Sequence, residues 1–249
     1  MIKKIKILIA TGGTGGHVFP AYSLASHLSD NSYNVELITD HRGYKFLKDY
    51  KNLKIKKITS SPLIKKNIFK IFISMLVISY SILKSLIFLI LNRPKIIFGM
   101  GGYSSFPICI AAMILKIEFI IYENNLILGK ANRYLLPFAK KIFVSYKDLE
   151  GIPGKYNNKV CEIGNLIRKE IINSGKKKNE NDNIEEIKIL VLGGSQAAKV
   201  FAEKLPQIFK RCKDSKIPLK IYQQCLKNQN EQLSVFYKNL SIDFEIFNF

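Results

Sequence analysis

One pattern occurs three times in the chain: a short apolar run ends at glycines, and a segment with helical spacing of its apolar residues follows. The three copies are "KILIATGGTGGHVFPAYSLASHL" from Lys6, "KIIFGMGGYSSFP" from Lys95 and "IKILVLGGSQAAKVFAEKLPQIF" from Ile187. A short apolar run bounded by glycine is typical of a buried parallel strand, and strands that alternate with helices form a parallel sheet. The pattern therefore predicts the α/β fold class.

A polar segment from Asn173 to Glu186 divides the pattern into two units. It has no apolar periodicity, as expected of a linker or an exposed loop. We predict an N-terminal domain over residues 1–168, a linker over 169–187 and a second, incomplete domain over 188–249. Besides the three copies, the predicted strands are 34–40, 53–58, 118–125, 141–145, 218–225 and 243–249, and the predicted helices are 19–28, 68–91, 108–115 and 228–240.

The charge of the chain limits its partners. Lys and Arg outnumber Asp and Glu by 39 to 19, which gives a formal net charge of +20 at pH 7. Such a charge favours nucleic acid, an anionic membrane surface or phosphorylated substrates, although a genome-wide bias toward Lys, Ile and Asn is an equal alternative. No known nucleic-acid-binding motif accompanies the charge, so nucleic acid is not a predicted partner. The four cysteines form no CxxC pair, which argues against a zinc site and favours a reducing cytoplasm.

The most apolar segment runs from Ile68 to Leu91 and is long enough to cross a membrane. Lys70 and Lys84 interrupt it, so three alternatives remain. We favour a helix that lies against both the protein core and a membrane surface; the others are a transmembrane helix and a wholly buried helix. Nearby basic residues would attract anionic lipid. The residues predicted to face the membrane are Lys65, Lys66, Lys70, Leu76, Lys84, Phe88 and Arg93.

Each glycine loop predicts a phosphate site, because glycine lets the backbone approach a phosphate and the following helix directs its positive end toward it. The dinucleotide motif GxGxxG fails in the first two loops, where Val18 and Ser104 occupy the third glycine position. Asp40, at the end of the second strand, keeps a ribose-binding dinucleotide site as a weak alternative. No GK[ST] follows the glycines, so an ATP-binding loop of that type is not predicted.

His17 follows the first glycine loop, at the sheet edge where ligands bind in open α/β folds. An imidazole can accept a proton from a hydroxyl near neutral pH, so His17 is a candidate general base. A histidine that only caps the helix or bonds a backbone carbonyl would show the same spacing. The residues alone leave both alternatives open.

Five motifs together resemble the MurG family of bacterial transferases. "GGTGGHVFPA", "GMGGYSSFP", "YENNLILGKANR", "GNLIR" and "GGSQAAK" stand in the family's order and cover nearly the whole chain. The resemblance implies a GT-B fold of two Rossmann-like parallel-sheet domains. It also implies a hexosyltransferase that moves N-acetylglucosamine from UDP-N-acetylglucosamine to the 4-hydroxyl of MurNAc in lipid I, with inversion, in peptidoglycan synthesis. The implied location is the cytoplasmic face of the inner membrane, as a peripheral protein, and no metal or cofactor is implied.

Residue by residue, the resemblance implies that His17 is the general base and that six further residues bind substrates. These are Thr14, Gly15 and Gly16 in the first donor-contacting loop, together with Asn125, Arg168 and Ser195. For Asn125 and Ser195, a role as a turn or cap residue is the alternative.

The chain departs from the family's pattern at Tyr122, Asn124, Leu166 and Ala197, where the family has His, Gln, Pro and Gly. The match also stops at Phe249, before the family's uracil-facing and sugar-contacting loops. The alternative to a competent transferase is therefore an inactive remnant, or an acceptor- and membrane-binding half that needs a separate donor-domain chain.

Overall fold

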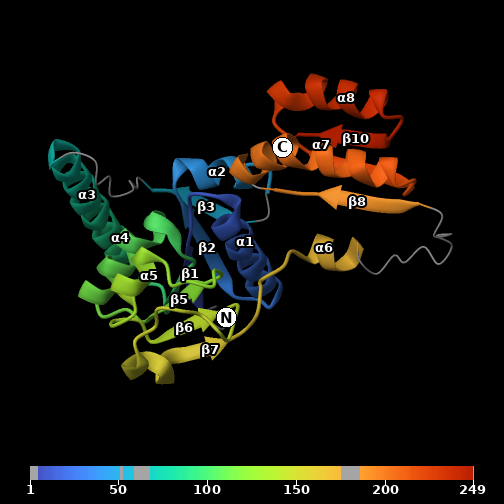
Figure 1. Cartoon of the computed structure of the whole chain (residues 1–249). Helices are drawn as coiled ribbons and strands as arrows, with labels where there is room; N and C mark the ends of the chain where they lie inside the picture. Colours follow the sequence, from blue (N-terminus) through green and yellow to red (C-terminus); the bar gives the residue numbers. More distant parts are fainter. Residues whose placement is uncertain (1–4, 51–52, 59–67, 175–185, 194, 249) are drawn as a thin grey trace. The chain divides into compact units, whose positions relative to one another are not determined.

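The computed structural model describes residues 5–50, 53–58, 68–174, 186–193 and 195–248, with the backbone alone at 68–70 and 195–198. The chain divides into two compact units, Met1–Lys177 and Lys178–Phe249 (Figure 1). Lys65, Lys66 and most of the predicted linker lie outside the described residues.

The first unit is built on a seven-stranded sheet in which every paired strand is parallel to its neighbour. The strand order is β3-β2-β1-β4-β5-β6-β7, so the order reverses at β1, between β2 and β4. The strands are β1 (Lys6–Ala10), β2 (Asn34–Thr39), β3 (Lys54–Lys57), β4 (Ile96–Gly99), β5 (Phe119–Glu123), β6 (Lys141–Val144) and β7 (Val160–Glu162).

Helices cover both faces of this sheet. Alternate side chains of β1 enter different cores: Ile7 and Ile9 pack with α1, whereas Leu8 and Ala10 pack with α3 and α4. Burial on both faces explains why β1 is apolar without interruption. The helices are α1 (Gly15–Asp30), α2 (His41–Leu47), α3 (Ile68–Asn92), α4 (Gly102–Ile114), α5 (Lys130–Leu135) and α6 (Lys169–Ser174), with a 3₁₀ helix at Gly154–Lys159.

Helix α3 packs along α4 with the side that carries small polar residues (Figure 1). Ser74, Ser81 and Ser85 are buried on this side. The hydroxyls of Ser81 and Ser85 each donate, at 2.7 Å, to the backbone carbonyl four residues earlier. The hydroxyls of Ser81 and Ser85 are therefore satisfied within the helix, and the small size of the serine side chains allows α4 to approach closely.

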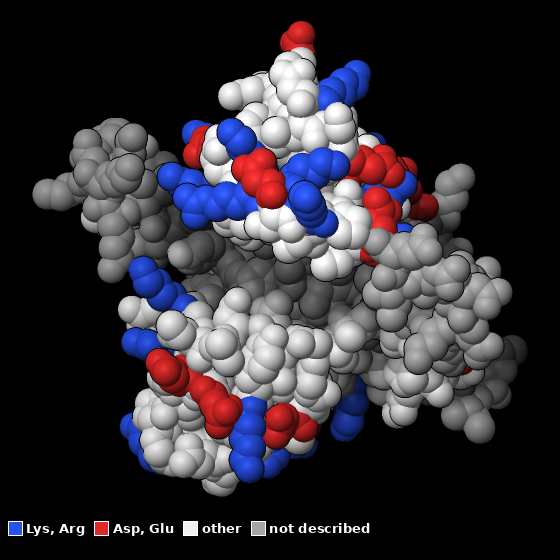
Figure 2. Space-filling model, turned by 45° about the vertical axis from the view of Figure 1, so that its right-hand side comes forward, with Lys and Arg blue, Asp and Glu red and all other residues white. Residues whose placement is uncertain are grey.

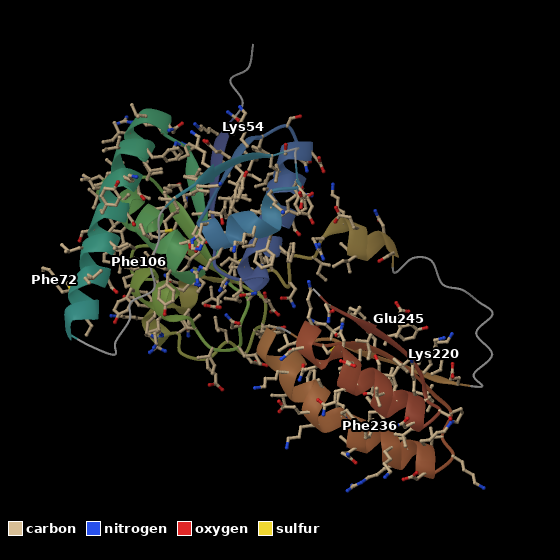
Figure 3. All side chains as sticks on the ribbon, turned by 90° about the horizontal axis from the view of Figure 1, so that it is seen from above. Lys54, Phe72, Phe106, Lys220, Phe236 and Glu245 are labelled. Atoms are coloured by element: carbon tan, nitrogen blue, oxygen red, sulfur yellow. The ribbon has the colours of Figure 1, made fainter. Side chains whose placement is uncertain are left out.

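The opposite side of α3 exposes large apolar side chains. Phe72 is 60% exposed and points away from the rest of the unit (Figure 3). Spacings of three and four residues place six such side chains on one side of the helix. We call them the outer face of α3: Phe72, Leu76, Tyr80, Leu83, Ile87 and Ile90. The wholly buried alternative for this segment is therefore wrong. Within the described residues, Ile71–Asn92 is the one helix long and apolar enough to cross a membrane.

The second unit has a three-stranded parallel sheet with the order β10-β9-β8. Ile221 of β9 and Tyr237 of α8 are fully buried at the centre of its core. Phe236 lies on the helical side of the sheet, and Lys220 and Glu245 lie on the other side (Figure 3). The elements are β8 (Ile187–Val191), α7 (Ser195–Asp214), β9 (Leu219–Gln224), a 3₁₀ turn at Lys227–Gln229, α8 (Asn230–Asn239) and β10 (Asp243–Phe247).

The structure confirms the predicted α/β class with two Rossmann-like parallel sheets, and the strands agree with the predicted ranges to within two residues. Two helices begin earlier than predicted. Helix α1 begins at Gly15 rather than Phe19, and α4 begins at Gly102 rather than Ile108, because the glycine loops themselves form the first turns. Helices α2, α5 and α6 and strand β7 were not predicted.

Candidate active site

The two glycine loops of the first unit meet at the carboxyl edge of its sheet. Strands β1 and β4 are neighbours there, and the helices that follow them cover opposite faces. Parallel α/β sheets bind ligands at such a switch point. The contact between the loops requires glycine: a Cβ on Gly12 would lie 2.3 Å from Ser104 Oγ, and a Cβ on Gly101 would lie 2.9 Å from His17 Nδ1.

Both helices begin at this edge without a side-chain cap. The residue before α1 is Thr14 and the residue before α4 is Gly101, and no side-chain hydrogen bond caps either helix. Gly101 has a φ of +81°, a left-handed conformation that favours glycine. Helix amino ends present N–H groups and the positive end of the dipole, so this edge suits an anionic group.

Asp40 ties the first glycine loop to helix α2. Its Oδ1 accepts hydrogen bonds from the backbone N–H groups of Gly13, at 3.1 Å, and Gly43, at 2.8 Å, and its Oδ2 accepts one from Arg42, at 2.8 Å. Burial acts to raise the pKa of this carboxyl, but the hydrogen bonds outweigh burial and lower the pKa to about 2. Because the Asp40 carboxylate already accepts these hydrogen bonds within the protein, the structure argues against a role for Asp40 in binding the ribose of a dinucleotide.

The lowered pKa of Asp40 predicts a pH-dependent stability. A decrease from 3.8 to about 2 means that the ionised group stabilises the fold by about 2 kcal/mol above about pH 4, and this is lost as the pH falls toward 2. We expect Asp40→Asn to lower the free energy of unfolding by about 2 kcal/mol at neutral pH and to converge with the unmodified chain near pH 2. Urea unfolding over a pH series measures the difference, and a constant difference would contradict the prediction.

His17 lies in the first turn of α1, and its ring faces the second glycine loop. With Tyr103 and Glu123 it lines a pocket of about 150 Å³. Burial lowers the pKa of the imidazole from its ordinary value, and the charge of Glu123 and a polar contact with the Met100 backbone oppose that decrease. A lowered pKa leaves the ring neutral near pH 7, the state that a general base requires.

Six of the nine residues that line this pocket come from the segment between Glu123 and Asn132, which joins β5 to α5. Only Asn125 among them was predicted as a site residue. Glu123 could have been recognised, because a carboxylate ends the otherwise apolar strand sequence "FIIYE". Tyr103 and Lys130, which also line the pocket, carry no comparable signal. Among the residues that the structure describes, no group of three or more His, Cys, Asp or Glu could hold a metal ion.

The structure brings the predicted residues of the first glycine loop together with the pocket. Thr14, Gly15 and Gly16 form the amino end of the helix that carries His17, and Asn125 lines the pocket beside that histidine. These five residues therefore lie at the same edge of the sheet, and their roles remain predictions.

Arg168 does not line this pocket, and Ser195 belongs to the second unit. The Arg168 guanidinium lies over the Phe19 ring, 4.3 Å from its centroid, and donates to the Tyr50 hydroxyl at 3.4 Å. Ser195 is the first residue of α7 in the second unit. The substrate-binding roles of both remain predictions.

The described residues of the predicted membrane surface differ in exposure. Leu76 is 56% exposed on the outer face of α3, and Lys84 lies beside that face with its Nζ 4.7 Å from the Tyr80 ring centroid. Arg93 is exposed just after the helix. Phe88, in contrast, is half-buried against the core. The side chain of Lys70 lies outside the described part of the chain.

Tyr122, one of the departures from the family pattern, joins three segments. Its hydroxyl lies 2.7 Å from Ser145 Oγ, just after β6, and donates to the Gly164 carbonyl at 3.3 Å. The tyrosine thus connects β5 to the segment that leads to Arg168.

Two Rossmann-like parallel sheets, the first with a pocket at its carboxyl edge, define the fold as that of the GT-B class. The model of the glycosyltransferase family 28 N-terminal domain matches residues 7–144, and that of the family 28 C-terminal domain matches residues 188–249. The chain belongs to glycosyltransferase family 28.

Curated relatives match along almost the whole chain. The UDP-N-acetylglucosamine--N-acetylmuramyl-(pentapeptide) pyrophosphoryl-undecaprenol N-acetylglucosamine transferase of Pelagibacter ubique is 38% identical over 98% of this chain and 67% of its own length. The protein of the same name from Rickettsia bellii is 35% identical over 98% of this chain and 68% of its own length. The chain thus spans about two thirds of the length of these relatives.

Solved structures share the fold. The crystal structure of Acinetobacter baumannii MurG has a TM-score of 0.71 at 23% identity, covering 98% of this chain and 66% of that one. The UDP co-structure of S. aureus MnaA has a TM-score of 0.62 at 15% identity, covering 98% of this chain and 68% of that one. At these identities the likeness concerns the fold alone.

Proposed function

We propose that the chain transfers N-acetylglucosamine from UDP-N-acetylglucosamine to the 4-hydroxyl of MurNAc in lipid I, a step of peptidoglycan synthesis. The names of the curated relatives support this substrate pair. The observation in the structure that carries the proposal is His17, a partly buried imidazole of lowered pKa that lines a pocket beside the amino ends of α1 and α4.

The proposed reaction is a single displacement. The acceptor hydroxyl oxygen attacks the anomeric carbon, the bond from that carbon to UDP breaks, and the configuration inverts. His17 takes the proton that the hydroxyl loses, which makes the oxygen a better nucleophile. The uncapped amino end of α4 would receive the diphosphate of the acceptor. The loop of Thr14, Gly15 and Gly16 at the amino end of α1 would contact the donor, and the amino end of α7 would receive the donor's diphosphate.

A transfer assay tests the proposal directly. The purified chain, a soluble lipid I analogue and radiolabelled UDP-N-acetylglucosamine are expected to yield a disaccharide product and UDP in equal amounts. Omission of the acceptor is the control for donor hydrolysis. Acceptor binding without any transfer would contradict the proposal and would instead support the acceptor-binding half that needs a separate donor-domain chain.

We also propose that the chain acts as a peripheral protein at the cytoplasmic face of the inner membrane, where a lipid-linked acceptor is available. The outer face of α3, flanked by Lys84 and followed by Arg93, combines apolar area with positive charge. On the face shown in Figure 2, basic and acidic side chains are interspersed. The proposal therefore rests on α3 rather than on the net charge of the chain.

A further inference from the structure

Glu123 is a buried carboxylate whose hydrogen bonds hold the loop that forms the pocket. Only 2% of the residue is exposed. Its Oε1 accepts from the backbone N–H of Asn125 at 3.2 Å and from Asn125 Nδ2 at 2.6 Å, and its Oε2 accepts from the Gly129 N–H at 2.8 Å and from Asn132 Nδ2 at 3.0 Å. A carboxylate has about four lone-pair sites. These four donors occupy them, so Glu123 is arranged to hold the loop rather than to bind substrate.

The same loop is anchored to the helix that carries His17. Pro20 lacks an N–H, so the Gly16 carbonyl four residues earlier has no helical partner at that position. This carbonyl accepts a hydrogen bond from Asn124 Nδ2 at 2.9 Å instead. The shape that Glu123 imposes on the loop is therefore fixed relative to His17.

The hydrogen bonds of Glu123 also determine which side-chain atom Asn125 presents to a ligand. With its Nδ2 held by Glu123, the exposed Asn125 side chain presents Oδ1, a hydrogen-bond acceptor, at the pocket. Three other titratable groups line the pocket with His17: Tyr103 from α4, Lys130 from α5 and Glu123 itself from β5. Of these, Glu123 carries the negative charge, which favours a protonated imidazole.

We propose that Glu123 is the positioning residue of this site: it orients Asn125 to accept a hydrogen bond from a hydroxyl or amide N–H of the sugar acceptor, and it stabilises the proton that His17 takes up. The inference rests on the proposed function for the identity of that ligand. The hydrogen bonds and the charge effect on His17 do not depend on it.

Steady-state kinetics of Glu123→Gln test the positioning role. The variant keeps the size of the side chain but removes its charge and directs an amide NH₂ toward loop donors. We expect kcat/KM for the acceptor analogue to fall by about tenfold or more, with KM for UDP-N-acetylglucosamine within about twofold. Glu118→Gln, which removes a surface carboxylate paired with Lys140 just before the same strand, is the matched control and should leave both unchanged. Unaltered acceptor kinetics in Glu123→Gln would overturn the proposal.

A nuclear magnetic resonance titration of the intact chain tests the second role without requiring catalysis. Loss of the negative charge in Glu123→Gln should lower the His17 pKa, whereas Glu123→Asp should keep that pKa near its original value and still impair acceptor kinetics, because the shorter side chain cannot reach all four donors. The exposed His27 and His41 serve as internal references. An unchanged His17 pKa in Glu123→Gln would overturn this role. A shifted pKa in a chain that transfers no sugar would contradict the proposed function and leave the charge effect standing.

Discussion

His17→Ala is expected to lower kcat for sugar transfer by about a hundredfold to ten-thousandfold, the range that a positioned general base contributes. The affinity for UDP-N-acetylglucosamine should change by less than about twofold, because a base acts on the acceptor hydroxyl as it attacks rather than on the bound donor. Initial rates with a saturating acceptor analogue, combined with calorimetric titration of the donor, separate the two quantities. His17→Ala removes a half-buried imidazole ring, so most of the surrounding core keeps its packing.

The matched control for this experiment lies on the same helix. His27 is exposed in the last turn of α1, so His27→Ala should leave kcat unchanged. Because burial lowers the His17 pKa from 6.5, the rate should fall on the acid side of that value, as the imidazole becomes protonated. A kcat for His17→Ala close to that of the unmodified chain would rule out the role of base, as would an equal loss in both histidine variants.

The edge of the sheet that holds the site was predictable, but the pocket wall was not. Glycine loops are recognisable because only glycine permits the close approach of Gly12 to Ser104 and favours the left-handed backbone of Gly101. A single residue type at a single position therefore reveals each requirement. The wall depends on hydrogen bonds that the Glu123 carboxylate accepts from residues up to nine positions further along the chain. No local sequence pattern predicts hydrogen bonds across this loop, and the only indication of them is a carboxylate at the end of a buried strand.

The rotation of α3 about its axis shows the same limit. The sequence is apolar on most sides, and Leu76 and Phe88 were both predicted to face a membrane. The buried serines decide the rotation, because small side chains at Ser81 and Ser85 allow α4 to approach that side. Phe88 then falls near the core, where it is half-buried, and Leu76 stays exposed. Phe88→Ser would therefore disturb the fold as well as any membrane contact.

Helix α3 buries the small polar side chains of Ser81 and Ser85 against the protein, while the large apolar side chains of its outer face are exposed. Exposed apolar patches of this kind mark interaction surfaces. If the helix crossed a membrane alone, its contact with α4 would be lost. Retention of that contact favours a helix that lies in the membrane surface with one side inserted.

The double variant Leu76→Ser, Leu83→Ser is expected to bind vesicles that contain anionic lipid at least about tenfold more weakly than the unmodified chain. Each leucine is 56% exposed on the outer face, so partial insertion of each contributes about 1 kcal/mol, and about 1.4 kcal/mol corresponds to a factor of ten. Vesicle sedimentation measures the affinity. Ile208→Ser, Val235→Ser removes two comparably exposed apolar side chains from the second unit and is the matched control. Alkaline carbonate should release the unmodified chain from membranes, and retention of the chain would contradict a peripheral contact. Equal vesicle binding by the two double variants would contradict a contact through α3.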